Sequence, residues 1–250
     1  MFFFRKKPDV SKAVPPQIST YPDHVAVIMD GNGRWAQKKH LPRIAGHRAG
    51  TENIRSVIEL FARYKIKYLT LYAFSTENWN RPESEVNGLM GILIDVIEKE
   101  ALKLNENNVK IQHLGYLPGL SAKLQSKIAK AVKLTASNTG LVLSVAFNYG
   151  GRSEILEAVR KIINDAIPSD KIDEEMLGNH LYTAGTPDPD FIIRTGGEMR
   201  MSNFLVWQSV YSEYYSTPVL WPNFDKKEID KALVEYSRRK RRFGALDKGK

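Results

Sequence analysis

The chain has 250 residues, of which 42% are hydrophobic and 26% are charged. This share of hydrophobic residues is enough for a packed core and excludes an intrinsically disordered chain. Cysteine is absent, which excludes a disulfide framework, a Cys-ligated zinc site and a thiolate nucleophile, and it leads us to expect a cytoplasmic protein. No apolar run reaches the roughly 18 residues of a membrane-spanning helix.

The net charge of +9 leaves several kinds of partner open. A positive surplus serves solubility alone, or it attracts an anionic ligand, an anionic membrane surface or nucleic acid. All three partners carry phosphate, so the net charge does not separate them.

Residues 1–22 contain prolines among charged residues, which predicts a mobile N-terminal tail. Phe2 to Phe4 precede Arg5 to Lys7, and because this order is the reverse of a signal peptide, we expect no secretion signal. We hypothesise that these residues make peripheral contact with the inner face of the membrane. A tail that does not touch the membrane is the alternative.

Short apolar runs alternate with helical patterns through the rest of the chain. Alternation of this kind predicts an α/β fold, a mainly parallel six-stranded sheet flanked by helices, in one domain over residues 23–243 followed by a C-terminal tail at 244–250. The expected strands are 24–30, 68–74, 109–115, 140–147, 191–195 and a short sixth at 210–215, and the expected helices are 46–64, 83–107, 121–137, 152–167, 173–181 and 225–241.

The first strand ends in a glycine-bearing loop, DGNGRWA, at residues 30–36. Glycines let the backbone approach a ligand, and exposed amides ahead of a helix bind phosphate. The spacing also fits a dinucleotide site, but that site needs an acid after the second strand, which ends in Phe74-Ser75-Thr76 instead. Asp30 and Arg34 favour a metal-bridged diphosphate; a plain tight turn is the alternative. Downstream, Arg43, His47 and Arg48 could neutralise a diphosphate or form a solvated basic face.

The second strand runs into STENWNRP at residues 75–82, a short loop with many functional side chains. The alternative is structural, with Ser75 or Thr76 as a helix cap, Trp79 packed and Arg81 paired with an acid. In the helix that follows, an apolar stripe from Val86 to Leu104 predicts a core-facing side. The same stripe could line a hydrophobic tunnel, and the sequence does not separate the two.

The fifth strand ends in RTGGEMRMSNF at residues 194–204, which predicts a second anion site. The nucleotide-binding pattern GxxxxGK[ST] is absent. Magnesium takes one or two carboxylates together with substrate phosphates, and Asp30 and Glu213 are the candidate ligands. The Asp-rich DDxxD motif of all-α prenyl synthases does not occur.

Taken together, these motifs resemble the cis-prenyltransferase family, and most of all its bacterial undecaprenyl diphosphate synthases. The resemblance covers about residues 22–244 in order. It rests on HVAVIMDGNGRWA (24–36), GHRAGT (46–51), LTLYAFSTENWNRP (69–82), NYGGR (148–152), IRTGGEMRMSNFLVWQ (193–208) and RRFG (241–244).

The resemblance implies a homodimeric, Mg²⁺-dependent transferase that adds isopentenyl diphosphate repeatedly to farnesyl diphosphate. The implied product is a Z-polyprenyl diphosphate near C55 for the lipid carrier of cell-wall synthesis. Asp30 and Asn78 would be catalytic, although a neutral amide is too weakly basic to remove a proton and suits orienting a diphosphate better. Asp30 and Glu213 would hold the metal. The substrate-binding residues would be Gly31, Asn32, Gly33, Arg34, Trp35, Arg43, His47, Ser75, Thr76, Glu77, Trp79, Arg81, Arg194, Arg200, Met201 and Ser202.

Two other functions are weighed against this one. A non-catalytic subunit of a two-protein synthase would lack the phosphate loop, but Asp30 and Arg34 are present. A nucleic-acid-binding protein would use the basic run 238–242, yet no nucleic-acid-binding motif accompanies it, and we expect no nucleic-acid partner. Met199 stands where some relatives carry His or Gln, which predicts altered diphosphate affinity. Phe204 to Trp207 are the expected apolar residues of the dimer interface.

Overall fold

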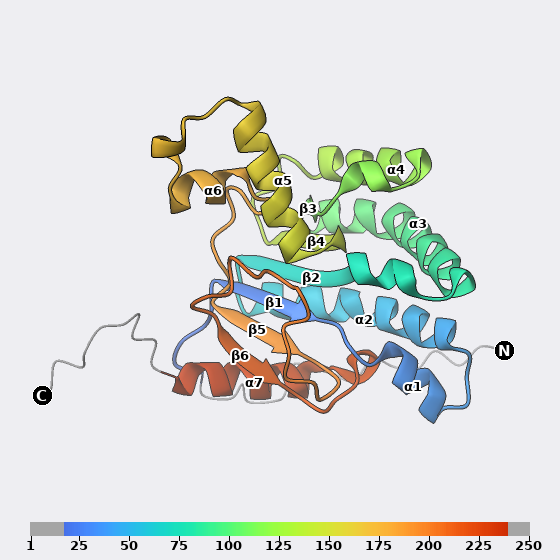
Figure 1. The fold of residues 1–250 in the computed structure, drawn as a ribbon. Helices are drawn as coiled ribbons and strands as arrows, with labels where there is room; N and C mark the ends of the chain where they lie inside the picture. The colour runs from blue at the N-terminus through green and yellow to red at the C-terminus, as the bar shows by residue number, and fades with distance from the viewer. Residues whose placement is uncertain (1–17, 240–250) are drawn as a thin grey trace, which may run out of the picture.

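The computed structural model describes residues 18–239, and the predicted α/β fold with a single six-stranded sheet is confirmed (Figure 1). The strands are β1 (His24–Ile28), β2 (Tyr68–Ser75), β3 (Lys110–Leu114), β4 (Val142–Tyr149), β5 (Phe191–Arg194) and β6 (Glu213–Ser216). The helices are α1 (Asn32–Lys38), α2 (Arg43–Arg63), α3 (Glu83–Glu106), α4 (Ala122–Leu134), α5 (Gly151–Asn164), α6 (Glu174–His180) and α7 (Lys226–Arg238).

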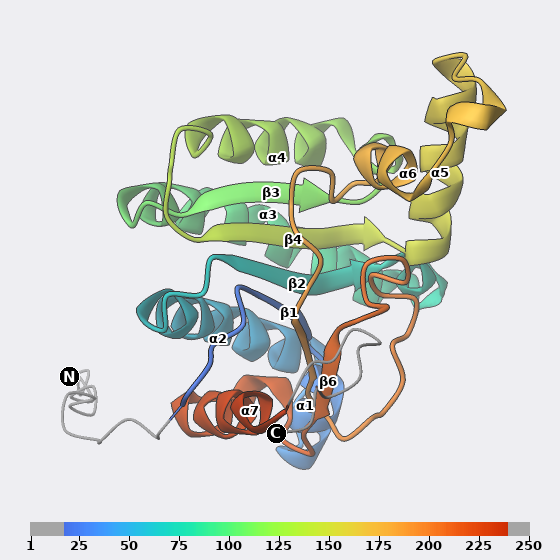
Figure 2. The same cartoon turned by 90° about the vertical axis from the view of Figure 1, so that its left-hand side faces the viewer.

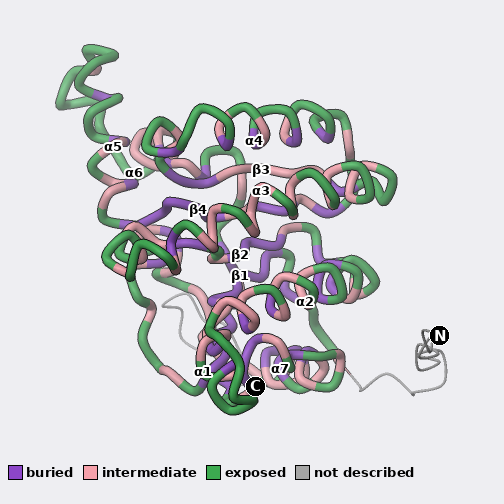
Figure 3. The backbone as a smooth tube through the Cα atoms, turned by 90° about the vertical axis from the view of Figure 1, so that its right-hand side faces the viewer, coloured by how far each residue is buried: buried purple, intermediate pink, exposed green. Residues whose placement is uncertain are grey.

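The sheet has the order β3-β4-β2-β1-β5-β6, and every pair of neighbouring strands is parallel. All five residues of β1 are buried, as are all four of β5. Burial on both faces is typical of parallel strands and explains why these runs read as continuously apolar rather than alternating. Figure 3 shows the buried residues concentrated along the strands, with exposed residues on the outer helix faces.

The two faces of the sheet are covered differently. On one face, Val25, Val27 and Leu71 pack against apolar residues of α2 and α7, with α3 and α4 further along the same side. On the other face, Ala26 and Ile192 pack against Phe204 and residues near it. Figure 2 shows the connection between α6 and β5 crossing in front of this face, so a loop covers part of it where helices cover the first face.

Several elements begin or end at other residues than predicted. A short helix, α1, begins at Asn32 inside the predicted glycine loop, and α2 begins at Arg43 rather than 46. The sixth strand begins at 213, not 210. Residues 18–22, predicted as tail, belong to the fold, because Ile18 packs on the core and Tyr21 stacks on Tyr64. The rest of that tail, the membrane-contact hypothesis for residues 2–7, and the C-terminal tail lie outside the described residues.

The strand order reverses between β1 and β5. From β1 the chain moves to β2 and the strands beyond it, whereas from β5 it moves to β6 on the opposite side. Loops that leave in opposite directions open a crevice beyond the carboxyl ends of the strands, where ligands of such sheets bind. Ile28 pairs with Arg194 in this register, so the two predicted anion loops start side by side. No helix in the described part of the chain is long and apolar enough to cross a membrane.

We predict that Gly46→Ala lowers the free energy of unfolding. A Cβ at this position would lie 2.0 Å from the backbone oxygen of Asn32, so α1 and α2 would have to separate. Overpacking of this kind costs about 1–3 kcal/mol. Urea unfolding followed by circular dichroism measures the change.

Gly91→Ala is the matched control, because nothing lies within 4 Å of its Cβ position and Gly91 is inside α3. The control should gain about 1 kcal/mol from its higher helix propensity. Equal stability changes in the two variants would contradict the close approach of α1 and α2.

Candidate functional site

An ion pair joins the two predicted anion loops. Arg194 Nη2 donates to Asp30 Oδ2 at 3.0 Å, and the same guanidinium donates through Nη1 to Ser202 Oγ at 2.7 Å. Nη1 also donates to the backbone oxygen of Arg200. Arg194 is 3% exposed, so its charge needs a partner, and Asp30 supplies it. The pair brings Asp30, Arg194, Arg200 and Ser202 together, as the sequence predicted.

The charges around Asp30 keep it ionised. Burial by itself would raise the pKa of this carboxyl, but hydrogen bonds and charge from Arg194 and Arg34 outweigh the burial and hold the pKa below its ordinary value. Asp30 therefore presents a carboxylate, not a carboxylic acid, at neutral pH. A hard oxygen anion at the end of a strand is a suitable ligand for Mg²⁺.

Arg34 connects α1 to the loop after β5. Its guanidinium donates to the backbone oxygen of Gly196 at 2.6 Å and lies 3.3 Å from Asp30 and 4.0 Å from Glu198. Gly31, the residue before α1, has a φ of 110°, a conformation that favours glycine. This turn allows α1 to begin directly after Asp30, with Arg34 on its first turn.

Two buried polar atoms in this region have no hydrogen-bond partner among the described residues. They are Nε of Arg194 and Oδ1 of Asn32. An unpaired buried donor beside an exposed basic loop fits an anionic ligand, since phosphate oxygens would accept from it. Arg200 adds a more exposed guanidinium, which pairs with Glu198 at 2.6 Å.

A second cationic group lies on the other side of the glycine loop. Glu85, in the first turn of α3, accepts from Arg43 Nε at 3.1 Å and from Arg81 Nη1 at 3.1 Å, and it lies 3.3 Å from His47 Nε2. A Cβ on Gly33 would lie 2.9 Å from the Arg43 guanidinium, so this group borders the loop. Burial lowers the pKa of His47, against the opposing effect of Glu85, so its ring is largely neutral at pH 7.

The loop after β2 is held by a reciprocal capping arrangement. Asn78 Oδ1 accepts from the backbone NH of Ser75 at 3.1 Å, and the Ser75 side chain accepts in return from the backbone NH of Asn78. Both side chains therefore cap the loop, which is the structural alternative predicted for Ser75. Thr76 donates to Glu77 at 3.2 Å.

Asn203 bridges the loop after β2 to the loop after β5. Its Nδ2 donates to Glu77 Oε1 at 2.7 Å, while its side-chain and backbone oxygens accept from the backbone NH groups of Arg152 and Gly151 at the start of α5. Burial raises the pKa of Glu77, but the Asn203 hydrogen bond and others give a net lowering. Ser202 and Asn203 have φ values of 51° and 61°, which is strain of a kind found at functional sites.

The two tryptophans predicted near a substrate chain lie in different surroundings. Trp79 packs edge-on against Phe74 with ring centroids 5.1 Å apart, and its Nε1 donates to Asn148 at 2.7 Å. Trp35 instead donates to Asn223 at 3.0 Å and carries the Lys39 ammonium over its ring. Trp79 therefore packs behind Phe74, which lines the cavity, and neither tryptophan lines the cavity itself.

The structure does not bring Glu213 to Asp30. Glu213 begins β6 and pairs in register with Phe191, whereas Asp30 follows the opposite ends of the strands. The separation along the strands is about five residues, or roughly 16 Å. Glu213 Oε2 accepts from Arg239 at 2.8 Å, so within one chain this carboxylate serves an ion pair. Met199 is 73% exposed, and Met201 packs on the core beside the loop.

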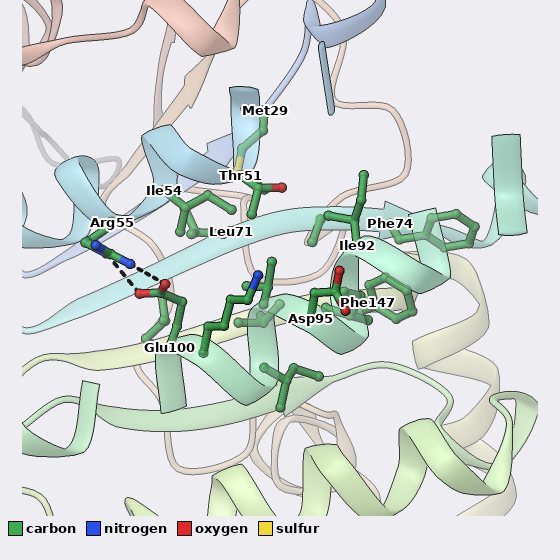
Figure 4. Close-up of a pocket in the computed structure, with 18 of the residues that line it drawn as sticks. Met29, Thr51, Ile54, Arg55, Leu71, Phe74, Ile92, Asp95, Glu100 and Phe147 are labelled. Carbon is green, nitrogen blue, oxygen red and sulfur yellow. Dashed lines mark hydrogen bonds and ion pairs between the residues drawn. The ribbon is translucent and has the colours of Figure 1, made fainter. Parts of the chain in front are cut away.

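A cavity of about 640 Å³ lies between the sheet and the helices α2, α3 and α4. Figure 4 shows its apolar wall, with Met29 and Ile54 on one side and Phe74, Ile92 and Phe147 on another. Asn32 and His47 also line it, so the cavity reaches the two cationic groups. The apolar stripe of α3 thus has both predicted tasks: Leu89 and Leu93 line the cavity and also pack on the hydrophobic core.

Sequence reasoning missed three residues of this site: Glu85, Glu198 and Asn203. Each also contacts residues that are distant in sequence, such as Arg43 for Glu85, Arg34 for Glu198 and Glu77 for Asn203, and these contacts have no local signal. The i,i+4 spacing of Arg81 and Glu85 was the one pattern that could have identified Glu85 as a pairing partner.

The chain is similar over nearly its whole length to known prenyltransferases. The profile of a family described as putative undecaprenyl diphosphate synthase matches residues 28–244. An isoprenyl transferase from Heliobacterium mobile is 49% identical over 241 residues, which cover 94% of this chain and 93% of that protein.

Two solved structures share the fold. Lavandulyl diphosphate synthase from Lavandula x intermedia, in complex with dimethylallyl diphosphate, has a TM-score of 0.86 and 36% identity, covering 90% of this chain and 98% of that one. A probable undecaprenyl diphosphate synthase from Campylobacter jejuni has a TM-score of 0.77 and 31% identity, covering 90% and 99%. With 36% and 31% identity, these two proteins resemble the chain in sequence as well as in fold.

We predict that Asp30→Asn destabilises the protein at pH 7 by about 1–3 kcal/mol, because it leaves the buried charge of Arg194 without its counter-charge. The folded pKa of Asp30 is depressed, so its contribution is complete above the unfolded pKa of about 4 and is lost as the pH falls through the folded pKa. The difference between wild type and variant should therefore shrink at acid pH. Urea unfolding across the pH range measures it; a difference that does not change with pH would contradict the assignment.

Proposed function

Because the chain belongs to the undecaprenyl diphosphate synthase family and is a prenyltransferase, we propose that it is a Mg²⁺-dependent cis-prenyltransferase. It adds isopentenyl diphosphate repeatedly to farnesyl diphosphate and makes a Z-polyprenyl diphosphate near C55, undecaprenyl diphosphate for the lipid carrier of cell-wall synthesis. The single observation that carries the proposal is the placement of two arginine-bearing anion sites beside one largely apolar cavity. That arrangement suits two diphosphates and one hydrocarbon chain.

Each cationic group has a task in this reaction. Breaking the bond between the allylic carbon and its diphosphate oxygen moves negative charge onto the leaving group, and preorganised cations stabilise that charge. Arg34, Arg43 and His47 border the glycine loop and bind the allylic diphosphate. The apolar cavity keeps water from the electron-poor allylic fragment, which water would otherwise trap.

Isopentenyl diphosphate binds at the loop after β5 through Arg194, Arg200 and Ser202. Its double bond attacks the allylic carbon, a new carbon–carbon bond forms, and one proton leaves to restore a double bond. The departing diphosphate is the proton acceptor. Asn78, whose oxygen already accepts from Ser75, positions the loop and does not act as a base.

The residues fit a magnesium ion at Asp30. Its carboxylate is ionised, and the unpaired buried donor Nε of Arg194 beside it suits a phosphate oxygen. Within residues 18–239 no group of three or more His, Asp or Glu could hold a metal alone, and Mg²⁺ bound through one carboxylate and substrate phosphates needs no such group. When bound, the ion supplies charge stabilisation for the leaving diphosphate.

The proposed homodimer has an apolar surface available to it. Leu156, Val159 and Ile163 are exposed along α5, and Val210 and Tyr211 are exposed in the loop before β6. A stripe of this kind marks a protein interface. Of the interface residues predicted from sequence, Phe204 and Leu205 are fully buried and Val206 is 42% exposed. A monomer in sedimentation equilibrium would contradict the homodimer.

The remaining proposals concern location and partners. We propose that the protein is cytoplasmic and makes peripheral contact with the inner face of the membrane. We propose no nucleic-acid partner. Binding to anionic vesicles tests the membrane contact. Salt-sensitive binding to RNA or DNA would contradict the last proposal.

We predict that the purified protein converts farnesyl diphosphate and radiolabelled isopentenyl diphosphate into long extractable products that disappear with EDTA. Asp30→Ala should lower the rate by about 10³-fold or more. The variant removes the proposed metal ligand and the carboxylate that holds Arg194 in place, so the charge on the leaving diphosphate is less well stabilised. Asp23→Ala, which removes a carboxylate that pairs with Lys67 at the surface, is the control and should retain full activity. No labelled product at any Mg²⁺ concentration would favour a non-catalytic partner subunit.

A further inference from the structure

The cavity is small for the product that the proposed function requires. A volume of about 640 Å³ is in the range of pockets that hold drug-sized ligands. A farnesyl chain of 15 carbons is of that size, but a chain near 55 carbons is several times larger. Part of the wall must therefore move as the chain grows, and the side that moves decides how long the chain becomes.

Most of the wall is fastened by apolar packing. The sheet side is built from β2, β3 and β4, where Leu71 and Leu143 are buried. On this side α2 is anchored by Val57, Ile58 and Phe61. On the other flank, α3 packs towards α4 through a cluster that includes Leu93, Ile97 and Ile128. Separating either contact would expose buried hydrophobic surface, which is costly.

The seam, the line of contact between α2 and α3, is bridged by ion pairs and hydrogen bonds at two positions. Near the mouth, Glu85 of α3 holds Arg43 and His47 of α2. Deeper, Arg55 of α2 and Glu100 of α3 form a bidentate pair, with Arg55 Nε donating to Glu100 Oε2 at 2.9 Å and Nη2 donating to Oε1. Arg55 lies eight residues beyond His47, so the second tie is about 12 Å further along α2.

The Arg55–Glu100 pair belongs to the cavity wall. Both residues line the cavity, and Figure 4 shows them on the side opposite Phe74 and Phe147, which lie near the carboxyl ends of β2 and β4. The Arg55 side chain is 48% exposed and that of Glu100 is 23% exposed. A pair so accessible to water can part at small energetic cost, unlike the apolar contacts on the other sides.

We propose that Arg55 and Glu100 form a clasp that limits the length of the product. The inference rests on the proposed function and adds two length-determining residues to it. With the clasp closed, α2 and α3 hold the distal cavity narrow, and elongation stops when the growing chain no longer fits. With the clasp removed, the seam opens more readily and longer chains are accommodated before release.

The test is the chain-length distribution made by full-length variants from farnesyl diphosphate and labelled isopentenyl diphosphate. Arg55→Ala and Glu100→Ala should each shift the distribution to longer products, and the double variant should shift it no further, because the two residues act as one unit. Arg55→Lys keeps the positive charge but loses the bidentate hydrogen bonding to Glu100, and it should give a smaller shift in product length. Lys67→Ala, which breaks the exposed Lys67–Asp23 pair away from the cavity, should leave the distribution unchanged.

A covalent cross-link between α2 and α3 gives an independent test of the clasp. Since the chain contains no cysteine, an Arg55→Cys/Glu100→Cys variant can be joined selectively by a short bis-maleimide. Before cross-linking its products should be longer than wild type; after cross-linking they should return to wild-type length or shorter. A mono-maleimide controls for modification alone.

Unchanged lengths in both alanine variants, or the same shift in Lys67→Ala, would overturn the clasp. A wild-type protein that makes no product at all would instead overturn the proposed function. A purely structural role would lower the amount of product without moving its length, so the two explanations give different readouts.

Discussion

The ion pair between Asp30 and Arg194 is the contact on which the rest of the site depends. It spans β1 and β5 at the point where the strand order reverses, and its arginine is almost wholly buried. A buried guanidinium requires a counter-charge, and meeting that need fixes the loop after β1 against the loop after β5. Arg34, Ser202 and the backbone of Arg200 then attach to the same two groups.

The site divides its tasks between charge and apolar packing. Cations are held at the crevice by acids that lie beside them, Asp30 for one group and Glu85 for the other. The cavity behind them is bounded by strands and helices that pack through hydrocarbon. This division matches a substrate with an anionic head and an apolar tail, because each part meets surroundings of its own kind.

Much of this could be predicted from sequence, for a physical reason. The carboxyl ends of parallel strands meet at one edge, so Asp30, Ser75 and Arg194 had to lie near one another once their strands were identified. The four interior strands, β4, β2, β1 and β5, were readily predicted because their burial leaves runs that are mostly apolar.

The features of the site that the sequence did not predict depend on tertiary contacts. Helix α1 has no capping side chain, and its start rests on the positive φ of Gly31, which sequence alone presents as a loop. Glu85 contacts Arg43 and His47 only after α2 and α3 come together. Glu213 was expected near Asp30 because the resemblance implies a second carboxylate at the metal. In the structure it begins β6 and pairs with Phe191, so it lies at the opposite ends of the strands from Asp30.

We propose that Asp30 binds Mg²⁺ together with the substrate diphosphate at the carboxyl ends of the strands, beside Arg194. Calorimetric titration of a non-reacting thio analogue of farnesyl diphosphate, with and without Mg²⁺, tests it most directly. We expect Mg²⁺ to tighten binding to the wild-type protein and to have little effect on Asp30→Asn. Equal tightening in both proteins would contradict the claim, because the metal would then be bound without Asp30.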